Sequence, residues 1–142
     1  MSAPTDLQAF HAQRIAEFRA NGGKLNPPLA TVPLLVLTTT GAKSGRPHAT
    51  PMSYTRDGER IIVVAAAGGS PRHPAWYHNL VANPEVTVEI GGETFPARAS
   101  VTIGPERDRL FAQHAASRPN FVEFQRQTER QLPVLILERL PG

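Results

Sequence analysis

A glycine-rich segment at the end of the first third of the chain carries residue types that bind anions. It reads Gly41-Ala42-Lys43-Ser44-Gly45-Arg46-Pro47. Its backbone N–H groups, hydroxyls, ammonium and guanidinium could all donate hydrogen bonds to a phosphate. The segment is not a Walker loop, because the upstream glycine is missing and because we expect it to join two strands. Taken alone, a basic hairpin turn of this kind is more often solvated surface than a ligand site.

A second segment offers a surface for a flat ligand. Ala65-Ala66-Ala67-Gly68-Gly69 has side chains too small to fill space, so a ring or a phosphate could approach its backbone closely. Trp76-Tyr77-His78-Asn79 follows shortly and contains the only tryptophan of the chain. Aromatic rings beside a strand of small residues form a suitable wall for a planar cofactor. The alternative is that Trp76 simply covers the core of a barrel.

Acidic residues are absent around both segments. None occurs between Glu17 and Asp57, and none between Glu59 and Glu85, although basic residues occur in both intervals. This distribution favours an anionic ligand, and chance clustering in a mildly basic protein is the alternative. Only two of the fifteen basic residues are lysine, and no dense basic run is present, so we expect no nucleic-acid partner.

Several kinds of chemistry are excluded or disfavoured. The chain has no cysteine, which rules out disulfides, thiolate metal ligands and thiol nucleophiles. No serine nucleophile elbow is present, and His73 and His78 are five residues apart, so they do not share a helix face. We therefore expect no metal site. No apolar run approaches the length of a membrane span, and no secretory pattern is seen, so we expect a cytoplasmic protein.

The apolar pattern and the turns predict one α+β domain over residues 1–142, with residues 1–25 as an N-terminal helical extension. Four helices and about six antiparallel strands, mostly in consecutive hairpins, predict a closed or nearly closed barrel with helices packed outside it. The expected helices cover residues 6–20, 75–81, 105–116 and 121–128. The expected strands cover residues 33–40, 48–56, 60–67, 86–90, 94–103 and 134–138.

Two stretches of the chain resemble the deazaflavin-dependent nitroreductase family. Leu37 to Pro47, followed by Thr50-Pro51, is similar to its first signature. Its second signature is matched in order and spacing by Gly68-Gly69, His73-Pro74, Trp76-Tyr77, Asn79-Leu80 and Ala82-Asn83-Pro84. The resemblance implies a split β-barrel like that of oxidases that bind flavin mononucleotide. It also implies binding of coenzyme F-420, a deazaflavin with a phosphate and a polyglutamate tail.

The resemblance implies a set of residues around that cofactor. The phosphate and acidic tail would lie against the 43–47 loop and His48, the ring against the small residues, and the aromatic segment would close over the ring and its ribityl chain. His48 stands where relatives commonly have arginine. The expected cofactor-binding residues are Thr38, Lys43, Ser44, Gly45, Arg46, Pro47, His48, Ala65, Ala66, Ala67, Trp76, Tyr77, His78 and Asn79.

The expected reaction is hydride transfer from reduced coenzyme F-420 to a planar electrophilic acceptor: a quinone, an enone or a nitro compound. Ser53, Phe121 and Phe124 are expected in the acceptor pocket, where they replace hydroxyl-bearing residues of the nitro-drug-reducing relative. This change favours a flat apolar quinone over a nitroimidazole. The proton could come from solvent, Tyr54 or His48, and the sequence does not choose.

Two alternatives to this reaction stay open at the level of sequence. One is a split-barrel oxidase that uses flavin mononucleotide, and the other is a non-catalytic deazaflavin carrier. We expect a monomer or a homodimer. Some relatives attach to the inner face of the membrane through their N-terminal segment, but Arg14 and Arg19 beside a modest apolar face are weak support for that here.

Overall fold

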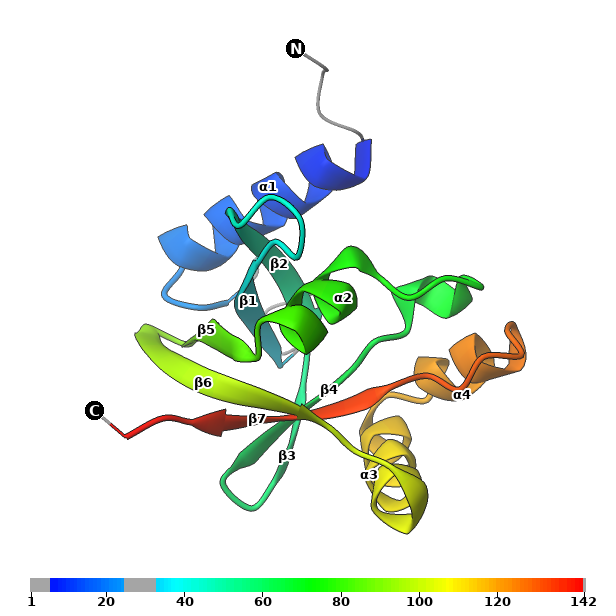
Figure 1. Ribbon diagram of the computed structural model, residues 1–142. Coiled ribbons are helices and arrows are strands. Elements are labelled where there is room, and N and C mark those ends of the chain that lie inside the picture. The colour runs from blue at the N-terminus through cyan, green and yellow to red at the C-terminus, as the bar shows by residue number, and fades with distance from the viewer. Residues whose placement is uncertain (1–5, 25–32, 142) are drawn as a thin grey trace.

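The computed structural model describes residues 6–24 and 33–141, with side chains from Phe10 onward in the first range. Four α-helices, one short 3-10 turn and seven strands make up this part of the chain (Figure 1). In chain order these elements are α1 (Asp6–Ala20), β1 (Leu34–Thr40), β2 (Pro47–Ser53), β3 (Thr55–Asp57), β4 (Arg60–Val64), η1 (Ala67–Gly69), α2 (Ala75–Ala82), β5 (Glu85–Ile90), β6 (Glu93–Val101), α3 (Gly104–Ser117), α4 (Asn120–Arg126) and β7 (Val134–Arg139).

The strands form one antiparallel sheet in the order β2-β1-β5-β6-β7-β4-β3. Its two edge strands, β2 and β3, are separated in the chain by Tyr54 alone. Ser53 and Thr55 therefore lie within about 7 Å of each other, which is the reach of two extended residues. The sheet has to curl until its two edges meet at Tyr54. This is the expected split β-barrel, and it is confirmed.

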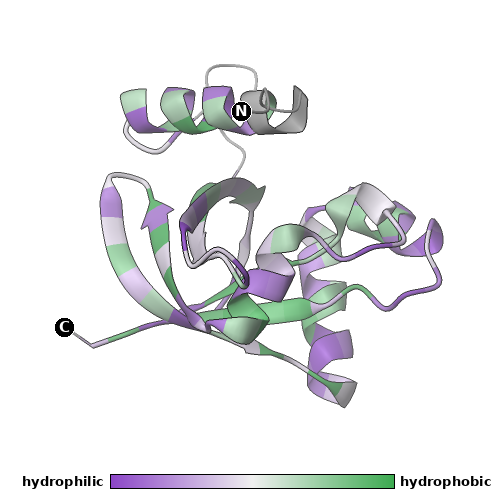
Figure 2. Cartoon of the chain, turned by 45° about the horizontal axis from the view of Figure 1, so that its top comes forward, coloured by the Kyte–Doolittle hydropathy of each residue, from purple (hydrophilic) through white to green (hydrophobic). Residues whose placement is uncertain are grey.

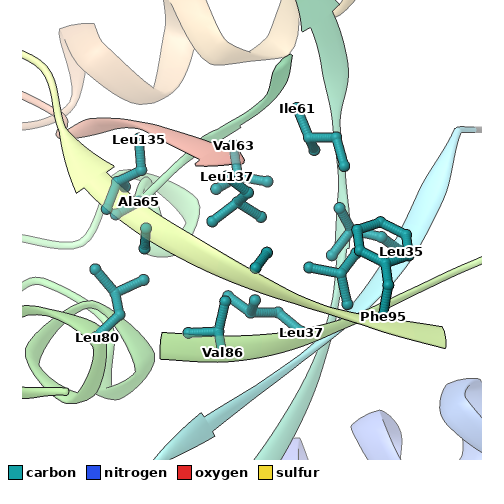
Figure 3. Packing of buried hydrophobic residues seen from close by; sticks show 13 residues of the cluster. Leu35, Leu37, Ile61, Val63, Ala65, Leu80, Val86, Phe95, Leu135 and Leu137 are labelled. Atoms are coloured by element: carbon teal, nitrogen blue, oxygen red, sulfur yellow. The ribbon is translucent and has the colours of Figure 1, made fainter. Parts of the chain in front are cut away.

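Alternate residues of the central strands point to opposite faces, and both faces are buried. The inward residues form the barrel core, where the side chain of Leu80 from α2 joins those of the strands (Figure 3). The core consists of Leu35, Leu37, Ile61, Val63, Ala65, Leu80, Val86, Val88, Phe95, Ala97, Ala99, Leu135 and Leu137.

Helices bury the outward residues. Val36 of β1 packs against Ile15 and Phe18 of α1, which lies over β1 and β2 (Figures 1 and 2). The outward side of β4 and β7 is covered by α3 and α4, and this second cluster comprises Ile62, Val64, Ala66, Leu110, Ala115, Phe121, Leu132, Val134 and Ile136. Within the described residues, no helix has both the length and the apolar character needed to span a bilayer.

Two expected strands differ from the structure. The single strand predicted for residues 48–56 is divided into β2 and β3, because the chain crosses from one sheet edge to the other at Tyr54. The strand predicted to run to Ala67 ends at Val64. Its partner β7 begins only at Val134, after Pro133, which has no N–H to donate to a further pair. The first and last residues of the expected segment 1–25 lie outside the described residues.

Candidate functional site

A cleft of about 1350 Å³ opens between α1, the loop after β1, strand β2, the η1 turn and α2. Among the described residues, none of those that line it is acidic. Its lining residues are His11, Ala12, Ile15, Gly41, Ala42, Lys43, Ser44, His48, Ala49, Thr50, Pro51, Ala67, Gly68, Pro74, Ala75, Trp76, His78 and Asn79.

The loop between β1 and β2 is closed by its own backbone. The N–H of Gly41 donates to the Arg46 carbonyl at 2.7 Å, and the N–H of Gly45 donates to the Gly41 carbonyl at 3.0 Å. Gly45 needs the left-handed φ of 69°, and a Cβ at residue 41 would collide with Ser44 Oγ. These constraints explain both glycines of the segment and give the loop a fixed shape.

The side chain of Asn79 joins this loop to α2. Its Oδ1 accepts from the N–H of Ala42 at 3.0 Å, and its Nδ2 donates to Thr39 Oγ1 at 3.2 Å. Asn83, which directly follows α2, donates to the Thr40 carbonyl at 3.4 Å. The loop that carries Lys43 and the helix that carries Trp76 are thereby held at a fixed distance across the cleft.

The η1 turn forms another part of the cleft wall. Ala67, Gly68 and Gly69 are all left-handed, with φ of 48°, 63° and 85°. For Ala67 this conformation costs roughly 1–2 kcal/mol. Ala67 and Gly68 line the cleft, whereas Gly69 is buried against α4. Backbone is exposed to the cleft here without a large side chain, which suits the close approach of a flat ring.

Helix α1 forms a wall that sequence reasoning did not place at the site. His11, Ala12 and Ile15 line the cleft from one face of this helix. The helix is held by the burial of Ile15 and Phe18 and by a bidentate ion pair of Arg19 with Glu89, at 2.9 and 2.8 Å. The signal in the sequence was the four-residue spacing of His11 and Ile15, which shows a shared face but not what that face covers.

The electrostatics of the cleft suit an anion. The Lys43 ammonium has no hydrogen-bond or ion-pair partner among residues 10–24 and 33–141. In the same loop, the backbone N–H groups of Ala42, Gly45 and Arg46 are used, whereas those of Lys43 and Ser44 have no acceptor in the described part of the chain. His11 also faces the cleft, where burial lowers its pKa. The Lys43 ammonium and the backbone N–H groups of Lys43 and Ser44 are thus available to donate to a negatively charged group.

A family model described as F420H(2)-dependent quinone reductase matches residues 11–139, which include every lining residue of the cleft. This chain belongs to that family. It is 37% identical over 128 residues to the F420H(2)-dependent quinone reductase Rv1261c of Mycobacterium tuberculosis, a match that covers 87% of this chain and 86% of that protein.

Two solved structures of similar sequence have the same fold. One, described as an F420-H2 dependent reductase (FDR-A), has a TM-score of 0.69 at 37% identity, over 75% of this chain and 94% of the other. The second, described as a domain-swapped dimer, has a TM-score of 0.72 at 34% identity, over 96% of this chain and all of the other. The expected family, fold, enzyme class and cofactor are confirmed by these matches.

The structure brings half of the expected cofactor-binding residues to the cleft. They come from the loop after β1, from the start of β2, from η1 and from α2: Lys43, Ser44, His48, Ala67, Trp76, His78 and Asn79. The others do not line it. Thr38 and Pro47 belong to the paired strands β1 and β2, and Gly45 and Arg46 close the loop through their backbones. The Tyr77 ring packs on the barrel core and on His73, with centroids 4.5 Å apart.

Ala65 and Ala66 require a correction. They were expected to line a ring together with Ala67, but Ala65 is buried in the barrel core and Ala66 in the second cluster. Successive residues here still point to opposite sides, and both sides are covered. Ala67, where the chain turns left-handed, is the first residue of the three to face the cleft.

The expected acceptor-pocket residues also lie elsewhere. Phe121 is buried in the second cluster, with its ring 4.5 Å from that of His114, and Phe124 packs on Phe121 at 5.4 Å. Ser53 is half-buried at the end of β2 and is not a lining residue. Tyr54 lines a separate cleft of about 520 Å³ that shares no residue with the first. Of the two proton-donor candidates, His48 alone reaches the larger cleft.

Proposed function

We propose that this protein transfers a hydride from reduced coenzyme F-420 to a quinone bound in the same cleft. One observation carries the proposal: in a chain of this family, the Lys43 loop and the Ala67–Gly68 turn face one cleft, and none of its described lining residues is acidic. Sites for single drug-sized ligands measure about 300–1,000 Å³. A cleft of about 1350 Å³ therefore has room for a cofactor and part of an acceptor.

The residues present fit the cofactor. Its phosphate and acidic tail would lie at the loop, where Lys43 and Ser44 have unpartnered donors and His48 is exposed. Its ring would lie against Ala67 and Gly68, with Trp76 opposite. Asn79 would act by holding the loop to α2, because both ends of its amide are already hydrogen-bonded to protein.

When bound, the cofactor supplies the hydride; the protein supplies position and electrostatics. Reduction of a quinone to a hydroquinone consumes one hydride and one proton. Of Tyr54 and His48, the two side chains expected from the sequence as proton donors, His48 is the one that faces the cleft. Its Nε2 lies 3.4 Å from Ser44 Oγ. Ala12, Ile15 and Pro51 add an apolar portion to the wall, which suits a flat apolar acceptor better than a nitro group that needs hydrogen-bond donors.

Titration of the purified protein with oxidised coenzyme F-420 and, separately, with flavin mononucleotide tests the cofactor, with chromophore fluorescence as the readout. We expect the deazaflavin to bind with micromolar or tighter affinity and the flavin to bind much more weakly. Preferential binding of flavin mononucleotide would move the protein to the oxidase alternative. Quinones are then compared with enones and nitro compounds as acceptors, and turnover is expected to be fastest with quinones.

A further inference from the structure

Arg130, in the segment between α4 and β7, makes an unusual number of contacts with one turn. Its guanidinium donates to the carbonyls of Ala66 at 2.7 Å, Ser70 at 2.8 Å and Ala65 at 3.1 Å. Ala66 directly precedes η1 and Ser70 directly follows it, so these contacts lie on both sides of the turn. Arginine is suited to this because its planar fork presents five donors in a fixed geometry.

The turn that Arg130 contacts has little internal support. Three successive residues are left-handed, and one of them, Ala67, carries a Cβ that disfavours this conformation. The turn's own backbone bonds are Gly69 N–H to the Ala66 carbonyl at 2.9 Å and Ser70 N–H to the Ala67 carbonyl at 3.1 Å. A strained segment persists only where its surroundings over-determine it.

Arg130 lies behind the wall of the cleft and not in it. Ala67 and Gly68 line the cleft, and Arg130 does not. Behind the turn, Gly69 approaches α4 so closely that a Cβ there would be 2.6 Å from Gln127 Oε1 and 3.0 Å from the Phe124 carbonyl oxygen. The turn therefore has α4 and Arg130 on one side and the cleft on the other.

The guanidinium of Arg130 is paired with these backbone carbonyls and not with an acidic side chain. No carboxylate forms an ion pair with it among the described residues. Its Nη1 lies 3.0 Å from His73 Nδ1, and because a guanidinium can only donate, this nitrogen of His73 must be the acceptor. Burial and the Arg130 charge lower the pKa of His73, which agrees with a neutral ring.

We propose that Arg130 is a positioning residue, which holds the left-handed turn in the shape that receives the deazaflavin ring. This rests on the proposed function, because the ring is the ligand assigned to Ala67 and Gly68. The proposal predicts that the planar guanidinium of Arg130 matters more for the shape of the turn than its positive charge does. Arg130→Lys keeps the charge, but its donors all sit on one nitrogen, whereas Arg130 reaches the three carbonyls with three separate nitrogens of a planar fork.

Hydrogen exchange of the cofactor-free protein tests whether Arg130 holds the turn. In Arg130→Lys we expect the amides of residues 66–70 to exchange at least tenfold faster, with residues 41–46 unchanged. Arg126→Lys is the matched control, since Arg126 is an exposed arginine near the same helix end, paired with Glu123, and should change neither region. Unchanged exchange at residues 66–70, or an equal increase along the whole chain, would overturn the inference.

Binding of two probes tests whether the turn receives the ring. Arg130→Lys should weaken oxidised coenzyme F-420 and its phosphate-free deazaflavin nucleoside by the same factor, at least tenfold. Lys43→Ala should weaken only the phosphorylated form. Faster exchange with unchanged affinity for both probes would contradict the ring assignment. Failure of the wild-type protein to bind coenzyme F-420 would overturn the proposed function, whereas the exchange result tests Arg130 independently.

Discussion

Asn79 Oδ1 accepts a hydrogen bond from the backbone N–H of Ala42 at 3.0 Å, which ties α2 to the loop between β1 and β2. Two elements far apart in the sequence thus share one side chain. The phosphate end and the ring end of the proposed cofactor site cannot move independently while this bond and the one to Thr39 are intact.

Replacement of Asn79 by alanine should therefore weaken cofactor binding, although we expect no direct contact between this side chain and the cofactor. Two hydrogen bonds are lost, and we expect a cost of about 1–2 kcal/mol, or roughly 5- to 30-fold in the dissociation constant for coenzyme F-420. Fluorescence titration measures it. Asn83→Ala removes the longer bond of 3.4 Å to the Thr40 carbonyl and should have a smaller effect. Equal effects of the two variants would remove the special role of Asn79.

The chain provides its own control for the loop lysine, because Lys24 is the only other lysine. Lys43→Ala should weaken coenzyme F-420 by about 1–3 kcal/mol, the range for a charge-assisted hydrogen bond to an anion. Lys24→Ala, at an exposed position after α1, should leave the affinity unchanged. The wild-type affinity should also fall with added salt, and less so in Lys43→Ala. Identical titrations for both variants would exclude Lys43 from the site.

Two features require glycine at residue 69: its positive φ and the close approach of Gln127. A comparison with Gly58 separates their effects. Gly69→Ala would place a Cβ at a φ of 85° and within 2.6 Å of Gln127 Oε1. Gly58→Ala, in the turn between β3 and β4, meets a positive φ of 63° but has no atom within 4 Å. We expect Gly69→Ala to lower the free energy of unfolding by about 1–3 kcal/mol more than Gly58→Ala does. Denaturant unfolding measures the difference. Equal decreases in the free energy of unfolding would mean that the end of α4 moves aside at no cost to make room for the Cβ.

His114 should make the protein sensitive to acid. The side chain is completely buried, its Nδ1 lies 2.9 Å from Thr55 Oγ1, and its Nε2 has no hydrogen-bond partner in the described structure. Burial, and then the Arg118 charge, lower its pKa from 6.5 to about 4. Above pH 6.5 both folded and unfolded chains hold it neutral. Between pH 6.5 and about pH 4, His114 is protonated in the unfolded state but stays neutral in the folded state.

The free energy of unfolding should accordingly fall as the pH drops, and this group alone should contribute about 2 kcal/mol between pH 7 and pH 5. Denaturant unfolding at both pH values measures it. His114→Gln should flatten this dependence, while His48→Gln, which removes an exposed histidine, should leave it as in the wild type. A wild-type stability that is constant from pH 7 to pH 5 would contradict the neutral, buried state of His114.

The sequence predicted the elements that local patterns determine. The helix and strand order, the hairpins and the Lys43 loop follow from residues that are neighbours in the chain, so their period and turn residues were sufficient. The glycines at 41 and 45 show this most directly, since both are required by contacts or dihedral angles within the loop itself.

What failed depended on contacts between distant segments. The alanines at 65 and 66 were expected to share one wall, but each side of β4 is covered by a different cluster. Phe121 was expected in the acceptor pocket and instead packs on His114, because α4 lies against η1 and α3. The contribution of α1 to the cleft was missed for the same reason: periodicity identifies a buried face but not its partner.

The most direct test of the central claim follows the oxidation of reduced coenzyme F-420 by the purified protein in the presence of a soluble quinone. We predict that the absorbance of the oxidised cofactor appears only with protein and quinone together, with one hydroquinone formed per cofactor. Lys43→Ala should slow it at subsaturating cofactor, and Lys24→Ala should not. Tight binding of coenzyme F-420 with no turnover on any quinone would contradict the claim and leave a carrier of the deazaflavin.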